Sequence, residues 1–266
     1  MTVDQAPPPT PTTNGGISRR KLLGAAVATG LAAVAAPGIE RVSAAEDLET
    51  PPSGERQWAF VFDLRRCDGC KECTKACQKM HHLPETQEWI KVYELEDTTG
   101  ESYFLPVLCQ MCQHPPCVEV CPVKATFSTD EGVVLVDQDV CIGCRMCMAA
   151  CPYGVRTFNW EPPPDIPEMF RSSTPEFQVP QVQGTVGKCD ACIHAMRDGR
   201  FPACVEGCSM DAVYVGDLVD DVATNGRETV VLSKFLRDND AFRLKTELGT
   251  ETRVYYIAGH GQDIDY

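Results

Sequence analysis

The run CIGCRMCMAACP at residues 141–152 decides the fold, because it spaces four cysteines as C-x2-C-x2-C-x3-C and ends on a proline. Three thiolates in a short irregular loop can reach three corners of one iron–sulfur cubane. The x3 step places the last thiolate on a following helical turn, from which it points toward a neighbouring cluster. The run therefore predicts a chain built around paired [4Fe–4S] clusters. Pro152 fixes the turn beside the last cysteine at little cost to the helix.

Three further groups of four cysteines have the same spacing or an expanded form of it. Residues 67–77 read C-x2-C-x2-C-x3-C, and residues 109–122 read C-x2-C-x4-C-x3-C-P. Residues 189–208 read C-x2-C-x11-C-x3-C, which keeps both ends of the pattern around a long insertion. The 16 cysteines thus form four complete groups of four, which favours four [4Fe–4S] clusters.

Other chemistries also use many cysteines. Full disulfide pairing suits exported proteins, but a fourfold recurrence of C-x2-C with C-x3-C has no disulfide rationale. Four-thiolate zinc sites use similar pairs, and the fourth group taken alone is compatible with zinc. A mixture of [4Fe–4S] and [3Fe–4S] clusters is a further alternative, although no group lacks a cysteine.

Composition narrows the classes of partner and reaction. The chain has 266 residues and a formal net charge of −14, with no lysine-rich tract, which argues against nucleic acid and anionic membrane surfaces. Hydrophobic residues make up 43%, as in ordinary globular proteins. No motif for binding a nucleotide, nicotinamide or flavin occurs, and we predict no catalytic residue.

The first 44 residues resemble an export signal. Residues 18–23 read SRRKLL, residues 22–39 are uncharged, and residues 42–44 read VSA. These are a basic region, an apolar region and a small-residue cleavage site, and the paired arginines resemble the twin-arginine type. We expect a cleaved twin-arginine signal over residues 1–44, with a retained membrane anchor as the alternative. No later segment approaches the length needed to cross a bilayer.

Apolar, β-rich runs lead into the cysteine groups. Residues 125–136 read as a hairpin whose turn is Asp130-Glu131-Gly132, and short helices are expected after the third cysteine of each group. The predicted strands lie at residues 58–64, 103–108, 133–136, 228–232 and 253–258. The predicted fold class is α+β: two interleaved bacterial-ferredoxin-like two-cluster modules with short strands, short helices and long loops.

Four cysteine groups in this order resemble a known family. An expanded second group ending in Cys121-Pro122, a third ending in Cys151-Pro152 and a split fourth are similar to the four-cluster ferredoxin-type subunit of membrane-associated oxidoreductases. That family serves dimethyl sulfoxide, polysulfide, thiosulfate and tetrathionate reductases. The resemblance covers roughly residues 57–257 and includes the opening run WAFVFDLRRC at residues 58–67.

The resemblance implies a pairing of groups that spacing alone leaves open. Groups one and four would form one two-cluster module and groups two and three the other, each pair exchanging its last cysteine. One cluster would be held by Cys67, Cys70, Cys73 and Cys208. A second would be held by Cys189, Cys192, Cys204 and Cys77. A third would be held by Cys109, Cys112, Cys117 and Cys151. The last would be held by Cys141, Cys144, Cys147 and Cys121.

The corresponding domain prediction is discontinuous. Residues 55–104 plus 185–262 form module A, residues 105–160 form module B, and residues 161–184 are a Pro-rich connection expected to drape over the surface.

The resemblance further implies a non-catalytic electron-transfer subunit. It would relay electrons between an integral quinone-binding subunit and a catalytic redox subunit of molybdopterin type. Export by the twin-arginine route would place it at the periplasmic or extracytoplasmic face of the cytoplasmic membrane. A soluble multi-cluster ferredoxin shuttle, an assembly factor, and a subunit of a cytochrome- or hydrogenase-containing complex are the alternatives.

Some basic residues near the cysteines could adjust the reduction potentials of the clusters. The candidates are Lys71, Lys124, Arg145, Arg156 and Lys188, each within a few residues of a cysteine. His81 and His82 follow the first group and are expected to face the surface or a partner.

Overall fold

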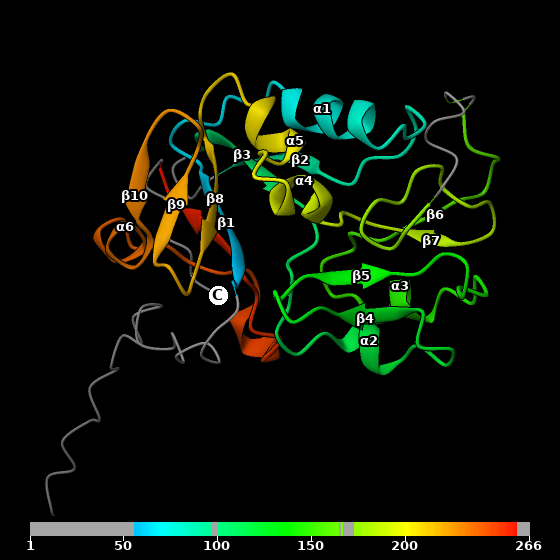
Figure 1. Ribbon diagram of the computed structural model, residues 1–266. Coiled ribbons are helices and arrows are strands. Elements are labelled where there is room, and N and C mark those ends of the chain that lie inside the picture. Colours follow the sequence, from blue (N-terminus) through cyan, green and yellow to red (C-terminus); the bar gives the residue numbers. More distant parts are fainter. Residues whose placement is uncertain (1–55, 97–99, 165, 167–172, 260–266) are drawn as a thin grey trace, which may run out of the picture. The chain divides into compact units, whose positions relative to one another are not determined.

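The computed structural model describes residues 56–96, 100–164, 166 and 173–259, all within the unit of residues 42–266 (Figure 1). The predicted signal over residues 1–44 lies outside the described residues.

A five-stranded sheet joins the beginning and the end of the described chain. Its order is β10-β9-β8-β1-β11. Strand β1 pairs antiparallel with β8 and parallel with β11. The strands are β1 (Trp58–Asp63), β8 (Val213–Asp217), β9 (Val222–Thr224), β10 (Thr229–Val231) and β11 (Val254–Ile257). The residues before the first cysteine group therefore lie beside residues that follow the fourth group.

The two faces of this sheet have different neighbours, because side chains alternate along a strand. Ala59 and Val61 of β1 pack with Leu232 of helix α6 (Leu232–Asp238). Phe60 and Phe62 point to the opposite face and belong to the main core, which also contains cysteines of three groups. The sheet thus supplies an apolar wall against which cysteine loops pack.

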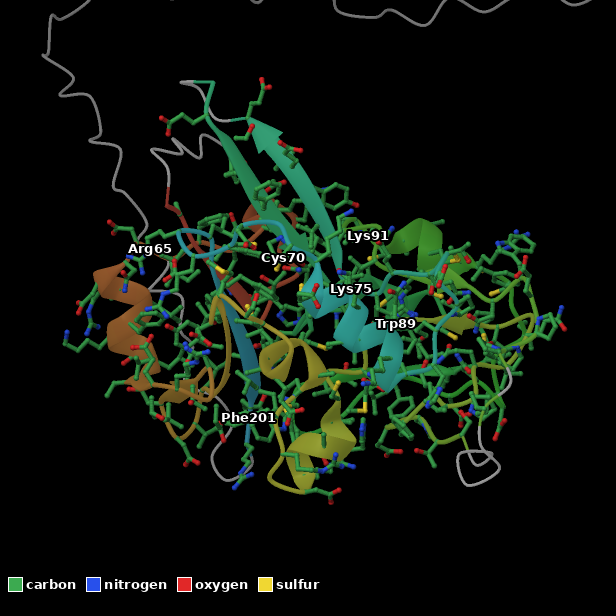
Figure 2. All side chains as sticks on the ribbon, turned by 90° about the horizontal axis from the view of Figure 1, so that it is seen from above. Arg65, Cys70, Lys75, Trp89, Lys91 and Phe201 are labelled. Carbon is green, nitrogen blue, oxygen red and sulfur yellow. The ribbon has the colours of Figure 1, made fainter. Side chains whose placement is uncertain are left out.

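Three two-stranded antiparallel sheets complete the strands. They are β2 (Lys91–Glu96) with β3 (Ser102–Val107), β4 (Thr126–Ser128) with β5 (Val134–Val136), and β6 (Thr157–Phe158) with β7 (Val186–Gly187). The β4–β5 hairpin confirms the one predicted from the sequence. The β2–β3 hairpin projects from the body of the protein (Figure 2).

In each cysteine group, the third cysteine lies on a short helix. These helices are α1 (Glu72–Met80), α2 (Pro116–Glu119), α3 (Met146–Ala150) and α5 (Ala203–Glu206). Each contains the third cysteine of its group, so the helices begin just before that cysteine, whereas the sequence predicted that they follow it. Helix α1 packs against α5, and α2 packs against α3. The remaining helical turns are α4 (Ile193–Arg197) and the 3-10 helix η3 (Thr246–Leu248).

The Pro-rich connection differs from the expected surface-draped segment. Gln178 and Val179 have none of their surface exposed. The side-chain amide of Gln138 donates to the Oε1 atoms of Gln178 (3.3 Å) and Gln181 (2.7 Å). Because buried amides require partners, this glutamine cluster allows part of a polar segment to enter the interior.

Within the described ranges, no helix has the length and apolar character required to cross a bilayer. Short strands and short helices linked by long loops around cysteine groups confirm the predicted α+β class.

Candidate functional site

One backbone feature recurs in all four cysteine loops. The residue directly before the second cysteine has a positive φ: Gly69 (74°), Met111 (46°), Gly143 (67°) and Ala191 (61°). This left-handed conformation turns the chain sharply between the first two thiols. Glycine adopts it without strain, whereas Met111 and Ala191 adopt it at a cost of about 1 kcal/mol each. Sequence reasoning missed the turns at these two residues, since neither residue type signals one.

The folded chain brings the 16 cysteines together in four sets. Site 1 contains Cys67, Cys70, Cys73 and Cys208. Site 2 contains Cys77, Cys189, Cys192 and Cys204. Site 3 contains Cys109, Cys112, Cys117 and Cys151. Site 4 contains Cys121, Cys141, Cys144 and Cys147. These sets have the same membership as the ligand sets implied by the family resemblance.

The x3 spacing divides neighbouring cysteines between sites. Cys73 and Cys77 both lie on α1, one helical turn apart, yet Cys73 belongs to site 1 and Cys77 to site 2. Cys147 lies within α3 and Cys151 ends it, and these belong to sites 4 and 3. Each short helix is therefore a bridge between two sites.

Sites 1 and 4 reach the surface. Each forms a pocket lined by its four cysteines. Cys70 in site 1 and Cys144 in site 4 are exposed. Cys70 lies at the beginning of α1, with Trp89 near the other end of that helix (Figure 2).

Sites 2 and 3 are enclosed. All four cysteines of site 2 are buried, as are three of site 3. Burial raises the pKa of the Cys189 thiol to about 12, with Asp190 adding to the rise. Burial likewise raises the pKa of Cys112 to about 12. Such thiols must lose their protons when iron binds, so cluster assembly at these sites releases protons.

Backbone N–H groups face several of the sulfur atoms. The Ala191 N–H donates to Cys189 Sγ (3.4 Å), and the Ala212 N–H donates to Cys208 Sγ (3.3 Å). Around Cys121, burial opposes ionisation, but the backbone N–H groups of residues 123–126 together lower the pKa of the thiol below its ordinary value. These donors offset the negative charge that thiolates and a bound cluster bring.

The prediction that His81 faces the surface or a partner is wrong. His81 is 1% exposed and does not face the surface, and its Nε2 atom lies 3.3 Å from Cys192 Sγ in site 2. The imidazole ring packs against Trp89, with ring centroids 4.8 Å apart. Burial lowers the pKa of His81, although Asp190 opposes the shift. The apolar ring face and the buried sulfur together explain why this histidine is drawn inward.

Asp190 is a buried carboxylate that the sequence analysis did not identify. It has none of its surface exposed, and its Oδ1 atom accepts a hydrogen bond from the Cys192 N–H at 2.8 Å. The same atom lies 3.6 Å from His81 Nε2. Asp190 therefore shapes the loop of the fourth group and places a negative charge beside site 2.

These features fit [4Fe–4S] clusters. All 16 thiols are free and gathered in fours, with backbone donors directed at sulfur. Iron held in this way is fully coordinated by thiolate and sulfide, which suits one-electron transfer and leaves no open position for a substrate.

Family models support the same cofactor. Residues 66–125 match a 4Fe–4S dicluster domain, and residues 100–163 match a second 4Fe–4S dicluster domain. Two dicluster domains and 16 cysteines correspond to four [4Fe–4S] clusters, as predicted.

Similar proteins cover most of the chain. A selenate reductase subunit of Mesobacillus selenatarsenatis is 38% identical over 221 residues, 77% of this chain and 73% of that protein. An Hdr-like menaquinol oxidoreductase iron–sulfur subunit of Archaeoglobus fulgidus is 35% identical over 282 residues, 92% of this chain and 100% of that protein. A tetrathionate reductase subunit of Salmonella typhimurium is 33% identical over 211 residues, 77% of this chain and 74% of that protein. The chain therefore belongs to the family of 4Fe–4S iron–sulfur subunits that includes those of selenate and tetrathionate reductases.

Proposed function

We propose that this iron–sulfur subunit relays electrons along four [4Fe–4S] clusters between a quinone-binding membrane subunit and a catalytic subunit of molybdopterin type. The observation that carries the proposal is the succession of four cysteine sites, of which only the two end sites contain an exposed cysteine. In such an arrangement, electrons can enter at one end site and leave at the other.

Interactions between thiols support the order of the sites. Burial raises the pKa of Cys204 in site 2, and Cys73 of site 1 adds to the rise. Burial and Asp190 raise the pKa of Cys189 in site 2, and Cys109 of site 3 adds to it. Sites 1, 2 and 3 are thus successive neighbours. Cys117 on α2 belongs to site 3, and Cys121 after that helix belongs to site 4. Cys147 on α3 belongs to site 4, and Cys151 after it belongs to site 3, so both helices connect the two sites.

Each site is proposed to ligate one cluster with its own four cysteines. The sharpest test uses Cys77, which terminates the loop of the first group but lies in site 2. In a Cys77→Ser variant we expect the paramagnetic resonance signal of the site 2 cluster to change, while that of site 1 is kept. A change confined to the site 1 signal contradicts the crossed ligand sets.

Metal analysis tests the cofactor content in this chain. Anaerobically purified protein should contain about sixteen iron and about sixteen sulfide per chain. Four zinc atoms without sulfide would contradict the assignment.

The partner assignment follows the similar proteins. Their names include selenate reductase, tetrathionate reductase and menaquinol oxidoreductase, which are consistent with a complex that joins a quinol to a terminal acceptor. Purification of the native complex should yield a polytopic membrane subunit and a molybdenum-containing subunit with this chain. Recovery of the chain alone favours a soluble shuttle or an assembly factor. Co-purification with a cytochrome or a hydrogenase favours the alternative that the chain is a subunit of a cytochrome- or hydrogenase-containing complex.

The location is proposed from the export signal. A twin-arginine signal carries folded, cofactor-loaded proteins, which suits a chain with four clusters. We expect the mature protein to begin at Ala45 and to lie on the extracytoplasmic side of the membrane. An Arg19→Lys, Arg20→Lys variant should remain in the cytoplasm, and normal export of that variant contradicts the assignment.

A further inference from the structure

Five basic side chains lie close to the cysteine groups, and burial separates them into two kinds. Lys71, Lys124 and Arg145 are exposed. Arg156 is 5% exposed, and Lys188 has none of its surface exposed. A buried cation is costly unless negative charge lies near it. The surroundings of Arg156 and Lys188 therefore show which parts of the protein interior carry negative charge.

Lys188 lies between sites 2 and 3. Its Nζ atom donates to the carbonyl oxygen of Val134 and, at 2.6 Å, to that of Cys189. Among the described residues, no carboxylate forms an ion pair with it. Burial raises the pKa of both Cys189 in site 2 and Cys117 in site 3, and Lys188 opposes both rises. Its charge thus acts on a thiol of each site.

Arg156 lies between sites 3 and 4. Its Nη1 atom donates to Thr126 Oγ1 at 3.2 Å. In the part of the chain that the structure describes, it too has no carboxylate partner. Burial disfavours the charged guanidinium, yet Cys117 of site 3 and Cys147 of site 4 together raise its pKa above its ordinary value. The guanidinium therefore lies near cysteines of both sites, Cys117 and Cys109 of site 3 and Cys147 of site 4.

We propose that Arg156 and Lys188 are two fixed interior cations that bracket site 3 and raise the reduction potential of the cluster held there, each cation being shared with one neighbouring site. This inference rests on the proposed ligand sets. Site 3 is influenced by both cations, sites 2 and 4 by one each, and site 1 by neither.

The physical reason is the charge that reduction adds. A reduced cluster carries one more negative charge than an oxidised one, and a nearby cation stabilises the reduced form. Interior charges are weakly screened by solvent and salt, so they act more strongly than surface lysines at similar distances. Site 2 also has the buried carboxylate of Asp190 beside it, which opposes Lys188. Site 3 thereby becomes the place in the relay where an electron is held most favourably.

The test is a redox titration of the iron-loaded chain, followed by paramagnetic resonance, on Lys188→Met and Arg156→Met variants. Lys188→Met should lower the potentials of two clusters, and Arg156→Met should also lower two. One cluster should respond to both substitutions, and a Cys112→Ser variant should identify it as the one in site 3. We expect at least a tenfold loss of electron affinity there, which is ~59 mV for a one-electron couple.

Controls separate charge from packing. Arg156→Lys keeps the charge and should restore most of the site 3 potential. Lys124→Met removes an exposed charge near the second group and should cause a much smaller shift that salt reduces, whereas the shifts from the buried positions should be independent of salt. If the Lys188→Met protein does not bind iron, a comparison of Arg156→Met with Arg156→Lys still shows whether loss of an interior charge lowers the reduction potentials of two clusters.

Two different failures can be distinguished. Full iron content with no cluster shared between the two variants, or shifts no larger than that of Lys124→Met, overturns the cation proposal alone. A shared cluster that Cys112→Ser leaves intact overturns the proposed ligand sets.

Discussion

The outer sites, 1 and 4, and the inner sites, 2 and 3, use the same four-cysteine chemistry in different surroundings. Each outer site has an exposed cysteine, Cys70 or Cys144, whereas neither inner site has one. In the proposed relay, electrons would reach a partner at the two end sites and would be shielded from solvent in the middle. The comparison indicates that burial, and not the type of ligand, distinguishes the outer sites from the inner sites.

This difference follows the spacing of the groups. Outer sites take their first three cysteines from the two groups with the regular C-x2-C-x2-C-x3-C spacing, and inner sites take theirs from the two expanded groups. In the fourth group the insertion contains helix α4, whose Ile193 and Ala195 are completely buried. The extra residues therefore provide covering structure that a regular group lacks.

The largest expected effect comes from removing one thiolate at an inner and at an outer site. Cys204→Ser acts where every cysteine is buried, and Cys70→Ser acts at an exposed one. We expect Cys204→Ser to lose the site 2 cluster, to reduce iron to about twelve per chain or fewer, and to lower the melting temperature strongly, since cluster binding supplies folding energy. Cys70→Ser should disturb site 1 and leave the other clusters intact. Iron analysis and anaerobic thermal unfolding measure both, and equal losses would remove the distinction between inner and outer sites.

A second test concerns how closely the rest of the chain covers an outer site. Gly143 has a φ of 67°, and a Cβ atom there would lie 2.1 Å from the carbonyl oxygen of Gly184. Gly154 has a similar φ of 63° but open space around it. Gly154→Ala should cost about 1 kcal/mol of unfolding free energy from backbone strain alone. Gly143→Ala should cost ~3 kcal/mol or more because of the added clash, and should weaken iron binding at site 4.

Chemical denaturation together with iron content checks that pair of glycine variants. Equal losses in the two proteins would mean that the segment containing Gly184 does not constrain the site 4 loop.

His81 tests whether an inner site depends on interior polar groups. We expect Nε2 to carry the proton and to donate to the Cys192 thiolate, from which it is 3.3 Å away. His81→Phe keeps an aromatic ring beside Trp89 but removes the donor, so reduction of the site 2 cluster should become less favourable by about 1 kcal/mol. His114→Gln is the control, because His114 is 63% exposed. A redox titration in which His81→Phe and His114→Gln match the unmodified protein would show that this contact does not affect the potential.

The smallest effect is expected at the surface beside site 1. Glu228 accepts a hydrogen bond from Tyr214 and forms an ion pair with Arg66 at 2.9 Å, next to Cys67. Hydrogen bonds from Tyr214 and Arg66 lower the pKa of Glu228. A carboxylate with a lowered pKa contributes stability above its ordinary pKa and loses it as the pH falls through the lowered value. Glu228→Gln should cost less than ~1 kcal/mol and should do so equally across neutral pH, because exposed pairs are weak.

Thermal unfolding of this variant at several pH values is the measurement. A cost that varies strongly between mildly acidic and mildly alkaline pH would indicate another titrating group.

Many local features could be read from the sequence. The predicted runs at residues 58–64, 103–108 and 133–136 correspond to β1, β3 and β5, because alternating β-branched and aromatic residues bounded by turn formers are specific for strands. The left-handed turns at Gly69 and Gly143 are of the type that glycine signals. Those at Met111 and Ala191 could not be read, since surrounding contacts impose them against local preference.

Burial of polar residues was much less predictable. His81, Asp190 and Lys188 carry side chains that are usually exposed, yet all three are buried beside the inner sites. The buried glutamines of the Pro-rich connection are a similar case. His81, Lys188 and the glutamines each have a partner far away in the sequence, as Cys192 is from His81, so no local pattern can reveal their burial.

The sequence by itself determined the number of sites, the chemistry of their ligands and the division of neighbouring cysteines between two directions, because a loop and a helical turn convert spacing directly into geometry. Tertiary structure alone decided which four thiols meet, which sites are enclosed and which charges surround them. Those properties depend on contacts between segments up to about two hundred residues apart in the chain, such as β1 with β11, and only folding brings these segments together.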